Sequence, residues 1–509
     1  MHRGLRAIVL GGFLLPTIGF GQITEIESLS TAGGQGNNWS LDCRLSADAR
    51  WLVFTSAANN FVPGDLGGSD IFIRDRNVDS TVRLSTTAAG LHAAGNHYRP
   101  DFTPDAKFVV WDTDAVAMFA LPTSGRQIVL RNRDTDLDGV FDEPGQFSNE
   151  LISRNLLGVA TLTGASTQPS ISGNGRYVAF TSEASDLVSF DLNGTADIFL
   201  RDRVANTTVC ISRGLNGRPG EGGLSNAPSI SRDGTHVVFQ SNATNLVAGD
   251  TNQTSDVFRY TIATGVIDRV SVAWNGAELA ASAVLSTEAT VGPCISSNGR
   301  HVVMQSISNN MAGGDFNNSV DVFVRDMEAD ALVRVSLTSN LGEIDGISQS
   351  GTISSNGRFV IFNSSAAGIV PGDNNRRSDV FLHDRDPDGD GEFDEPAART
   401  VRRVSVRTGG SEGANSSYAG RISDDGSSVA YSSTAALVAE DQNGFPDVYF
   451  TDFGEPGCPA DWNTDSSVDS NDVVGFFVDW DLGNADADGN GSSDSDDIAT
   501  FFVHWERGC

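Results

Sequence analysis

Pro169-Ser-Ile-Ser-Gly-Asn-Gly-Arg-Tyr-Val-Ala-Phe180 is a short motif that recurs along the chain. In each copy a short run precedes a turn, and an alternating apolar run follows it. Seven copies stand 57 to 69 residues apart, and their shared serine or threonine is Ser46, Thr103, Ser172, Ser231, Ser296, Ser354 and Ser423. A sustained internal repeat indicates one supersecondary unit per copy.

Each copy predicts a sheet of four short strands. The turn is Asn-Gly or Asp-Gly in five copies, and these dipeptides supply the positive φ angles of a two-residue hairpin. A third strand follows as Asp-Ile/Val-Phe, for example 197–202, and a fourth is of the type 401–406. Four strands repeated radially remove the exposed edges of an open sheet.

The sequence therefore predicts an all-β fold, a seven-bladed β-propeller. The last third strand, 447–452, has no fourth strand after it, whereas 23–30 has the missing strand's character. We expect this N-terminal strand to complete the seventh blade and close the ring.

The repeat resembles the TolB-like propeller repeat. The family's Ser-x-Asp-Gly-x-x-Val-Ala-Phe hairpin followed by Asp-Ile-Phe corresponds here to 172–180 and 197–199, and the resemblance covers about residues 23–455. It implies the propeller fold and little about function, because such propellers serve as binding platforms, as accessory domains and occasionally as enzymes.

The charge balance narrows the choice of partner. The 509 residues include 34 Lys and Arg against 66 Asp and Glu, which gives a net charge of −32. Such a chain repels phosphate backbones and anionic lipid headgroups, so we expect no nucleic-acid partner. A content of 39% hydrophobic and 8% aromatic residues excludes wholesale disorder.

Residues 1–21 predict a secretory signal peptide. Met1–Arg6 is basic, 7–20 is apolar, and small residues precede a cleavage site before Gln22. The alternative is an uncleaved anchor, although the apolar run is short and contains Pro16. We expect no transmembrane segment after cleavage, and a secreted, cell-surface or periplasmic protein.

Two kinds of acidic motif in the propeller could bind calcium. Asp-x-Asn-x-x-x-Asp precedes five third strands (191–197, 250–256, 315–321, 373–379 and 441–447). We favour a hydrogen-bonded turn there, because one cluster offers fewer oxygens than calcium takes. Two inserts resemble the start of an EF-hand loop, the alternative being solvated acidic tips. Their candidate calcium ligands are Asp134, Asp136, Asp138 and Asp142, and Asp386, Asp388, Asp390 and Asp394.

No catalytic residue set is predicted. The chain lacks His-Glu-x-x-His, a phosphate-binding loop and Cys-x-x-Cys. His92 and His97 are the one closely spaced histidine pair. They are expected near the channel mouth, as solvated loop residues or, less readily, as a metal or proton-transfer pair.

After Gly457 the composition changes to twelve acids and one base. Two matched loops lie there, each followed by an amphipathic stretch of helical spacing. The predicted calcium ligands are Asp461, Asn463, Asp465, the Ser467 carbonyl, Asp469 and Asp472, then Asp486, Asp488, Asn490, the Ser492 carbonyl, Asp494 and Asp497. Cys458 and Cys509 bracket this segment and are expected to form a disulfide, whereas Cys43, Cys210 and Cys294 share no spacing.

The segment 456–509 resembles a type I dockerin, the duplicated calcium-loop module that docks onto cohesins, in the Gly-Cys variant of planctomycete secreted proteins. The resemblance implies partner-reading residues at Ser470, Asn471, Ser495 and Asp496, and a cohesin-like or other scaffold protein as partner. Ser466 stands where the first loop should have glycine, while the second has Gly491, so the first site is expected to be weaker. A calcium-binding EF-hand pair is the simpler alternative.

These features predict three segments: the signal peptide 1–21, the propeller 22–455 and the calcium module 456–509. They favour a secreted, non-enzymatic binding protein whose propeller recognises a glycan or protein and whose module attaches it to a scaffold. The alternative is a tethered polysaccharide lyase or glycoside hydrolase. It would need a singular acid or histidine cluster at a channel mouth.

Overall fold

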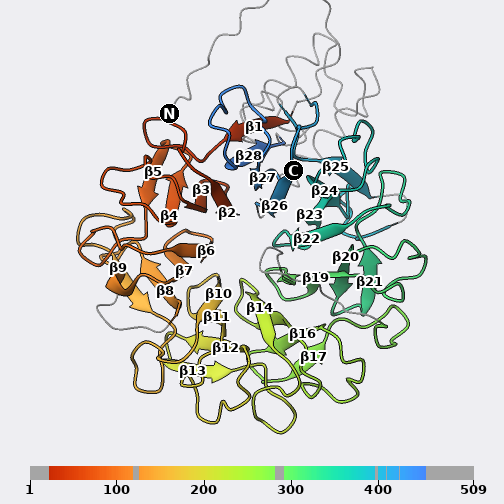
Figure 1. The fold of residues 1–509 in the computed structure, drawn as a ribbon. Helices are drawn as coiled ribbons and strands as arrows, with labels where there is room; N and C mark the ends of the chain where they lie inside the picture. Colours follow the sequence, from red (N-terminus) through yellow and green to blue (C-terminus); the bar gives the residue numbers. More distant parts are fainter. Residues whose placement is uncertain are drawn as a thin grey trace, which may run out of the picture. The chain divides into compact units, whose positions relative to one another are not determined.

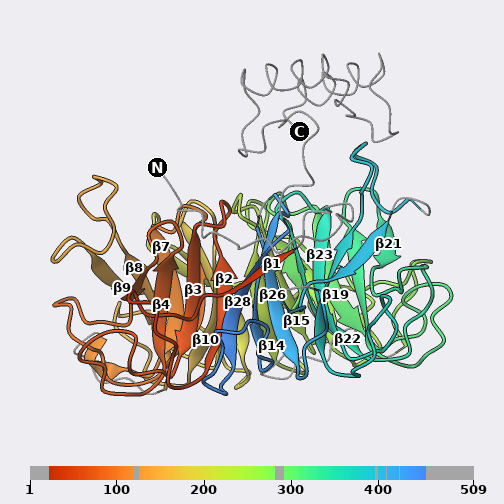
Figure 2. The same ribbon diagram turned by 90° about the horizontal axis from the view of Figure 1, so that it is seen from above.

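The computed structural model describes residues 22–118, 125–280, 292–395, 399–407, 410–423 and 425–453. Residues 24–452 belong to one compact unit. Its strands form seven antiparallel four-stranded sheets arranged around a common axis (Figure 1). In the perpendicular view the sheets stand side by side as blades (Figure 2). The seven-bladed propeller predicted from the repeat is confirmed.

In blades 1 to 6 all four strands follow one another in the sequence from the axis outward, and in blade 7 the first three do. Blade 1 contains β2 (Ser40–Leu45), β3 (Trp51–Ser56), β4 (Asp70–Asp75) and β5 (Ser80–Arg83). Blade 2 contains β6 (His97–Phe102), β7 (Phe108–Thr113), the short 3-10 turn η1 (Val116–Met118), β8 (Gln127–Asn132) and β9 (Ser148–Leu151). Blade 3 contains β10 (Ser166–Ile171), β11 (Tyr177–Ser182), β12 (Asp197–Asp202) and β13 (Thr207–Cys210).

The remaining blades repeat this order. Blade 4 contains β14 (Ser225–Ile230), β15 (His236–Ser241), β16 (Asp256–Thr261) and β17 (Ile267–Arg269). Blade 5 contains β18 (Cys294–Ile295), β19 (His301–Ser306), β20 (Asp321–Asp326) and β21 (Ala331–Arg334). Blade 6 contains β22 (Ser348–Ile353), β23 (Phe359–Ser364), β24 (Asp379–Asp384) and β25 (Thr400–Arg403). Blade 7 contains β26 (Ser417–Ile422), β27 (Ser428–Ser433), β28 (Asp447–Asp452) and β1 (Ile23–Ile26).

The predicted ring closure is confirmed, because β1 is the outer strand of blade 7 and pairs with β28 (Figure 1). The residues after β1 also join blade 7 to blade 1. Ser28 Oγ donates to Asp447 Oδ1 at 2.5 Å. The Glu27 carboxylate accepts Nε of Arg74 at 2.6 Å and Nε of Arg76 at 2.7 Å. The ring is therefore closed by backbone pairing and by a buried ionic contact.

The core repeats with the blades. In five blades an aromatic ring of the second strand stacks on one of the third, with ring centroids 5.6 to 6.0 Å apart. These pairs are Phe54–Phe72, Phe180–Phe199, Phe239–Phe258, Phe362–Phe381 and Tyr431–Tyr449. Each fully buried ring contributes roughly 1.5 to 3 kcal/mol. The hydrophobic clusters join neighbouring blades, as Val110 of blade 2 and Phe180 of blade 3 do.

A β-bulge interrupts the first strand of six blades, where the register of pairing with the second strand shifts. Five non-glycine residues at this point have φ between 51° and 58°, namely Asp42, Arg99, Gln168, Ala227 and Ser350. L-residues adopt such angles at a cost, and bulges commonly redirect side chains. Repetition of the bulge indicates that it is part of the architecture, and it precedes the residues that line the axis.

Two predicted segments lie outside the described residues: the signal peptide 1–21 and the calcium module 456–509. The helical part of the predicted fold therefore stays a prediction, and the described propeller is all-β apart from η1. Within the described ranges, no helix has the length and apolar character that a membrane span requires.

Candidate functional site

A pocket of about 250 Å³ lies on the propeller axis, at the end of the first strands that leads into the second. Residues of all seven first strands line it. One register position, two residues before the shared serine or threonine, supplies one side chain from each blade. These seven residues are Arg44, Asp101, Ser170, Ser229, Cys294, Thr352 and Arg421.

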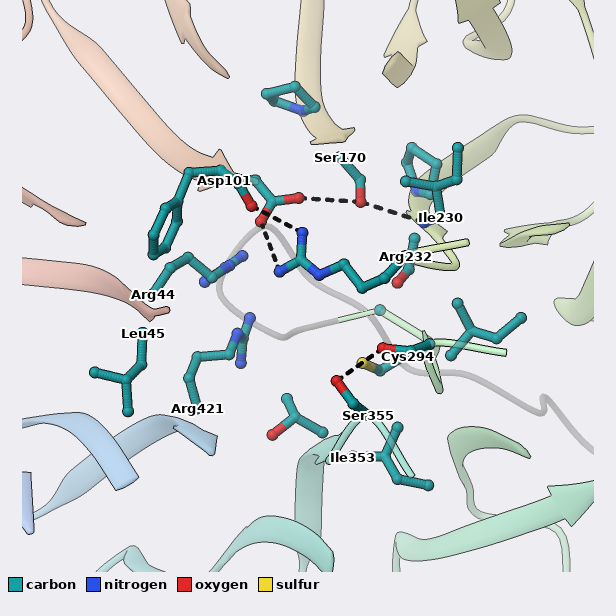
Figure 3. Close-up of a pocket in the computed structure, with 18 of the residues that line it drawn as sticks. Arg44, Leu45, Asp101, Ser170, Ile230, Arg232, Cys294, Ile353, Ser355 and Arg421 are labelled. Atoms are coloured by element: carbon teal, nitrogen blue, oxygen red, sulfur yellow. Dashed lines mark hydrogen bonds and ion pairs between the residues drawn. The ribbon is translucent and has the colours of Figure 1, made fainter. Parts of the chain in front are cut away.

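One half of the pocket, formed by blades 2 to 4, is cross-linked. Asp101 Oδ2 accepts Ser170 Oγ at 3.2 Å and the Ile171 amide at 3.0 Å. Arg232 donates to the Phe102 carbonyl at 2.8 Å and lies 3.7 Å from Asp101 Oδ1. Ser170 Oγ in turn accepts the Ile230 amide at 3.2 Å. These contacts connect blades 2, 3 and 4 (Figure 3).

The other half contains Arg44 of blade 1 and Arg421 of blade 7, which are neighbours across the ring closure. Each side chain is half-buried and donates to the carbonyl just before it, Arg44 to Cys43 at 3.1 Å and Arg421 to Gly420 at 3.0 Å. Among the described residues no carboxylate lies within ion-pair distance of either guanidinium. Both point toward the middle of the pocket (Figure 3).

The two arginines act on each other electrostatically. Burial and, next, the positive charge of Arg44 lower the pKa of Arg421 to about 10, while Asp101 acts in the opposite direction. The described pocket lining has four arginines, Arg44, Arg99, Arg232 and Arg421, against two acids, Asp42 and Asp101. A positive pocket in a chain of net charge −32 favours an anionic ligand.

The described pocket side chains include groups that can bind an anion. Guanidinium groups hold carboxylates, sulfates and phosphates through two parallel hydrogen bonds. Asp101 is engaged by its neighbours, Asp42 is exposed, and no histidine is found among the described lining residues. Cys294 contributes a half-buried thiol. This arrangement can hold an oxyanion.

The two histidines considered from their spacing lie away from the pocket lining. His97 is fully buried: Trp111 Nε1 donates to its Nδ1 at 3.1 Å, and its Nε2 lies 3.0 Å from the Ala93 carbonyl. Burial lowers the pKa of His97 to about 4. The side chain of His92 is 4% exposed, so the interpretation of solvated loop histidines is wrong.

His92 has a structural partner set. Its Nδ1 accepts the Leu66 amide at 3.0 Å, which places the proton of the neutral ring on Nε2, facing Asp70 Oδ2 at 3.6 Å. Asp65 lies 3.5 Å from Arg83. Asp65, Asp70 and His92 each have one possible metal-ligand atom, and these three atoms lie within 4.8 Å of one another. However, the protonated Nε2 of His92 cannot coordinate a metal. The guanidinium of Arg83 already provides a positive charge beside Asp65.

The Asp-x-Asn-x-x-x-Asp motif forms a hydrogen-bonded turn, as predicted. In blade 3, Asn193 Nδ2 donates to Asp197 Oδ2 at 2.7 Å, while Asn193 Oδ1 accepts the Thr195 amide at 3.1 Å. Ser212 Oγ donates to Asp197 Oδ1 at 2.7 Å. The same asparagine-to-aspartate bond recurs in blades 4 to 7. In each of these blades the asparagine side-chain nitrogen faces the aspartate, and its side-chain oxygen accepts a backbone amide. This oxygen is therefore not free to bind a cation beside the aspartate.

The acidic inserts bring together three of the four ligands predicted in each. The carboxylates of Asp134, Asp136 and Asp138 lie within 4.8 Å of one another, and so do those of Asp386, Asp388 and Asp390. The fourth acid is held by an arginine in both loops: Arg133 lies 2.8 Å from Asp142, and Arg385 Nε donates to Asp394 at 2.9 Å. Calcium binding at these loops stays a prediction.

The other predicted site residues lie outside the described residues. They are the twelve calcium ligands between Asp461 and Asp497, the four partner-reading residues Ser470, Asn471, Ser495 and Asp496, and the Cys458–Cys509 pair. The three described cysteines, Cys43, Cys210 and Cys294, are free thiols. Burial raises the pKa of Cys43 to about 11 and that of Cys210 to about 12, so neither thiol is reactive near neutral pH.

Sequence reasoning missed the pocket residues. Arg44, Asp101, Arg232 and Arg421 match no motif and stand far apart in the chain. Aligning the seven repeats at the residue two before the shared serine or threonine would have shown that Arg44, Asp101 and Arg421 are charged whereas the other four residues of this column are uncharged. This difference indicates a site only if the blades form a ring, because the ring places all seven residues of the column around one axis.

No family model and no curated protein matches this sequence. Several solved structures are similar in fold. Oligogalacturonate lyase from Vibrio parahaemolyticus is 9% identical, with a TM-score of 0.47, over 85% of this chain and 97% of that one. The β-propeller domain of the Trilobed protease from Pyrococcus furiosus is 10% identical, with a TM-score of 0.44, over 82% and 93%.

A structure described as TolB from Agrobacterium tumefaciens is 15% identical, with a TM-score of 0.34, over 58% of this chain and 80% of that one. Similarities this low say nothing about ligand or activity. The assignment of a seven-bladed propeller rests on the sheet topology.

Proposed function

We propose that this protein is an exported, non-enzymatic binding protein whose propeller recognises a ligand in the pocket on its axis. The observation that carries this is the convergence of side chains that differ between blades. At one register position the blades present arginine, aspartate, serine, cysteine and threonine, whereas the turns and core around them repeat. A singular pocket within a repeated scaffold is the expected place for recognition.

Binding is favoured over catalysis by the state of the polar groups. A glycan lyase or hydrolase would need an acid or base able to exchange protons with the substrate. Asp101 instead accepts two hydrogen bonds and faces Arg232. The arginines are suited to holding a charge.

The C-terminal segment 456–509 would attach the propeller to a scaffold. Support comes from its two calcium-loop sequences and from the resemblance to dockerins. Calcium would neutralise the loop carboxylates and order the segment, so that docking onto a cohesin-like or other scaffold protein requires calcium. Export is supported by the signal-peptide pattern of 1–21.

The test uses the purified full-length protein on a panel of neutral glycans, acidic glycans and peptides. We expect a ligand whose binding is lost in the Arg44→Gln/Arg421→Gln double variant and kept in Arg50→Gln. Arg50 lies outside the pocket and pairs with Asp75 at 2.7 Å. Release of a shortened or unsaturated product from the bound ligand would establish an enzyme instead. Capture on an immobilised cohesin with and without chelator tests docking separately.

A further inference from the structure

Arg44 and Arg421 present two guanidinium groups that form no ion pair with a described carboxylate, although Asp101 acts on Arg421 from a greater distance. Each donates one hydrogen bond to a neighbouring carbonyl, and the described residues offer no acceptor within hydrogen-bond distance to its other N–H donors. Their mutual repulsion in a half-buried site costs free energy in the empty protein. An oxyanion between them would remove this repulsion and accept two-pronged hydrogen bonds.

The rest of the ring offers neutral polar groups. Ser229 of blade 4 and Thr352 of blade 6 occupy the same register position as the arginines. Gln168 and the hydrogen-bonded Ser297–Ser355 pair, 2.7 Å apart, also line the pocket. Hydroxyl and amide groups can both donate and accept, which suits a ligand rich in hydroxyls. Thr352 Oγ1 donates to the Gly420 carbonyl and Gln168 Oε1 accepts two protein groups, so these side chains offer a ligand their remaining hydrogen-bonding capacity beside the arginine pair.

The size and charge of the site limit how much of a ligand enters. A space of about 250 Å³ is below the roughly 300 to 1,000 Å³ of pockets that take drug-sized molecules. It has room for a single terminal unit. The net charge of −32 repels a dense polyanion at long range, so sparse acid groups are favoured.

From these observations we infer that the pocket binds the end of an acidic saccharide, and that Arg44 and Arg421 together hold its carboxylate or sulfate group. The inference rests on the proposed recognition function and adds the chemistry of the ligand. A uronic acid and a sulfated sugar supply the same oxyanion chemistry. A peptide with a terminal carboxylate is a different class of ligand, which the test below separates.

The experiment is calorimetric titration of the full-length protein with galacturonate, galactose 6-sulfate, neutral galactose and a short peptide with a free carboxylate. We expect at least one acidic sugar to bind at least tenfold more tightly than galactose. Preference for galacturonate or for the sulfated sugar identifies the source of the oxyanion. Arg44→Gln and Arg421→Gln should each weaken that binding at least tenfold, and Arg44→Lys should weaken it less.

Arg50→Gln serves as the matched control, with thermal unfolding to establish that every variant is folded. Equal binding of galactose and both acidic sugars, unchanged binding in the double variant, or selective binding of the peptide would overturn the saccharide assignment. If another ligand still requires the pocket, the recognition function stands. If no member of the full glycan and peptide panel depends on a pocket residue, the proposed function fails as well.

Discussion

The two halves of the axial pocket use the same register position in opposite ways. In blades 2 to 4, Asp101 and Ser170 are bonded to each other and to neighbouring backbone, and Arg232 closes the network. In blades 7 and 1, Arg421 and Arg44 face each other's charge, and neither forms an ion pair with a described carboxylate. Polar groups satisfied within the protein stabilise it, whereas charges left unsatisfied lower stability and remain available to a ligand.

The unpaired arginines also flank the seam at which the ring closes. There the buried Glu27 accepts hydrogen bonds from Arg74 and Arg76, and Ser28 bonds Asp447. These contacts stabilise blades 7 and 1 against the repulsion on their inner side. The comparison therefore predicts that the seam, the cross-linked half and the unpaired half differ in how much each contributes to stability.

The largest effect is expected at the seam. Deletion of residues 22–30 removes β1 and exposes the β28 edge, and it leaves Arg74 without its closest carboxylate. Breaking a buried ion pair alone costs about 3 to 5 kcal/mol. We expect a markedly lower melting temperature or aggregation, measured by calorimetry and size-exclusion chromatography. A truncated protein as stable and monomeric as the parent would refute closure by β1.

The next effect is expected in the cross-linked half. Asp101→Ala leaves the Ser170 hydroxyl and the Ile171 amide without their acceptor and Arg232 without its counter-charge. We expect the free energy of unfolding to fall by about 2 to 4 kcal/mol. Urea denaturation of Asp101→Ala, Arg232→Gln and the double variant should show coupling of at least about 1 kcal/mol. Additive losses would mean that the two side chains act independently.

In the unpaired half the same type of substitution should have the opposite consequence. Arg44→Gln or Arg421→Gln removes like-charge repulsion and breaks no described ion pair. We expect the free energy of unfolding to stay the same or to rise by up to about 1 kcal/mol, while Arg232→Gln lowers it. If all three variants lose equal stability in urea, the two halves do not differ.

A smaller difference, in calcium affinity, is expected between the acidic inserts of blades 2 and 6. Lys107 Nζ lies 3.5 Å from Asp134 Oδ2, whereas no lysine or arginine is paired with Asp386, Asp388 or Asp390 in the described structure. A resident cation competes with calcium, so the blade 6 loop should bind calcium roughly tenfold more tightly. Calcium titrations of Asp388→Ala and Asp136→Ala check this, and a greater loss in Asp136→Ala would reverse the order.

Much of the fold follows from local sequence, because the hairpin motif recurs seven times and its turn is Asn-Gly or Asp-Gly in five of the copies. The closing strand was predictable, since one blade lacked a strand and the N-terminus supplied its pattern. The asparagine-to-aspartate turns also follow from local chemistry, because their partners lie within a few residues of each other.

The pocket could not be predicted in this way. Arg44 and Arg421 lie at opposite ends of the propeller sequence and become neighbours once the ring closes. His92 shows the opposite case. Its spacing to His97 in the sequence suggested a metal or proton-transfer pair. In the fold it occupies the place of Glu278 in blade 4, and both side chains accept a backbone amide there. The pocket residues differ from blade to blade, so they stand out only where the repeat is compared with itself.

The claim that Arg44 and Arg421 form an oxyanion site is tested most directly by locating an anion in crystals. Crystals of the protein soaked in selenate should show an anomalous selenium peak between the two guanidinium groups, and the peak should be absent from the Arg44→Gln/Arg421→Gln variant. We expect no peak at Arg232, whose charge faces Asp101. Selenate bound at Arg232 or elsewhere on the propeller, with none between Arg44 and Arg421, would contradict the account.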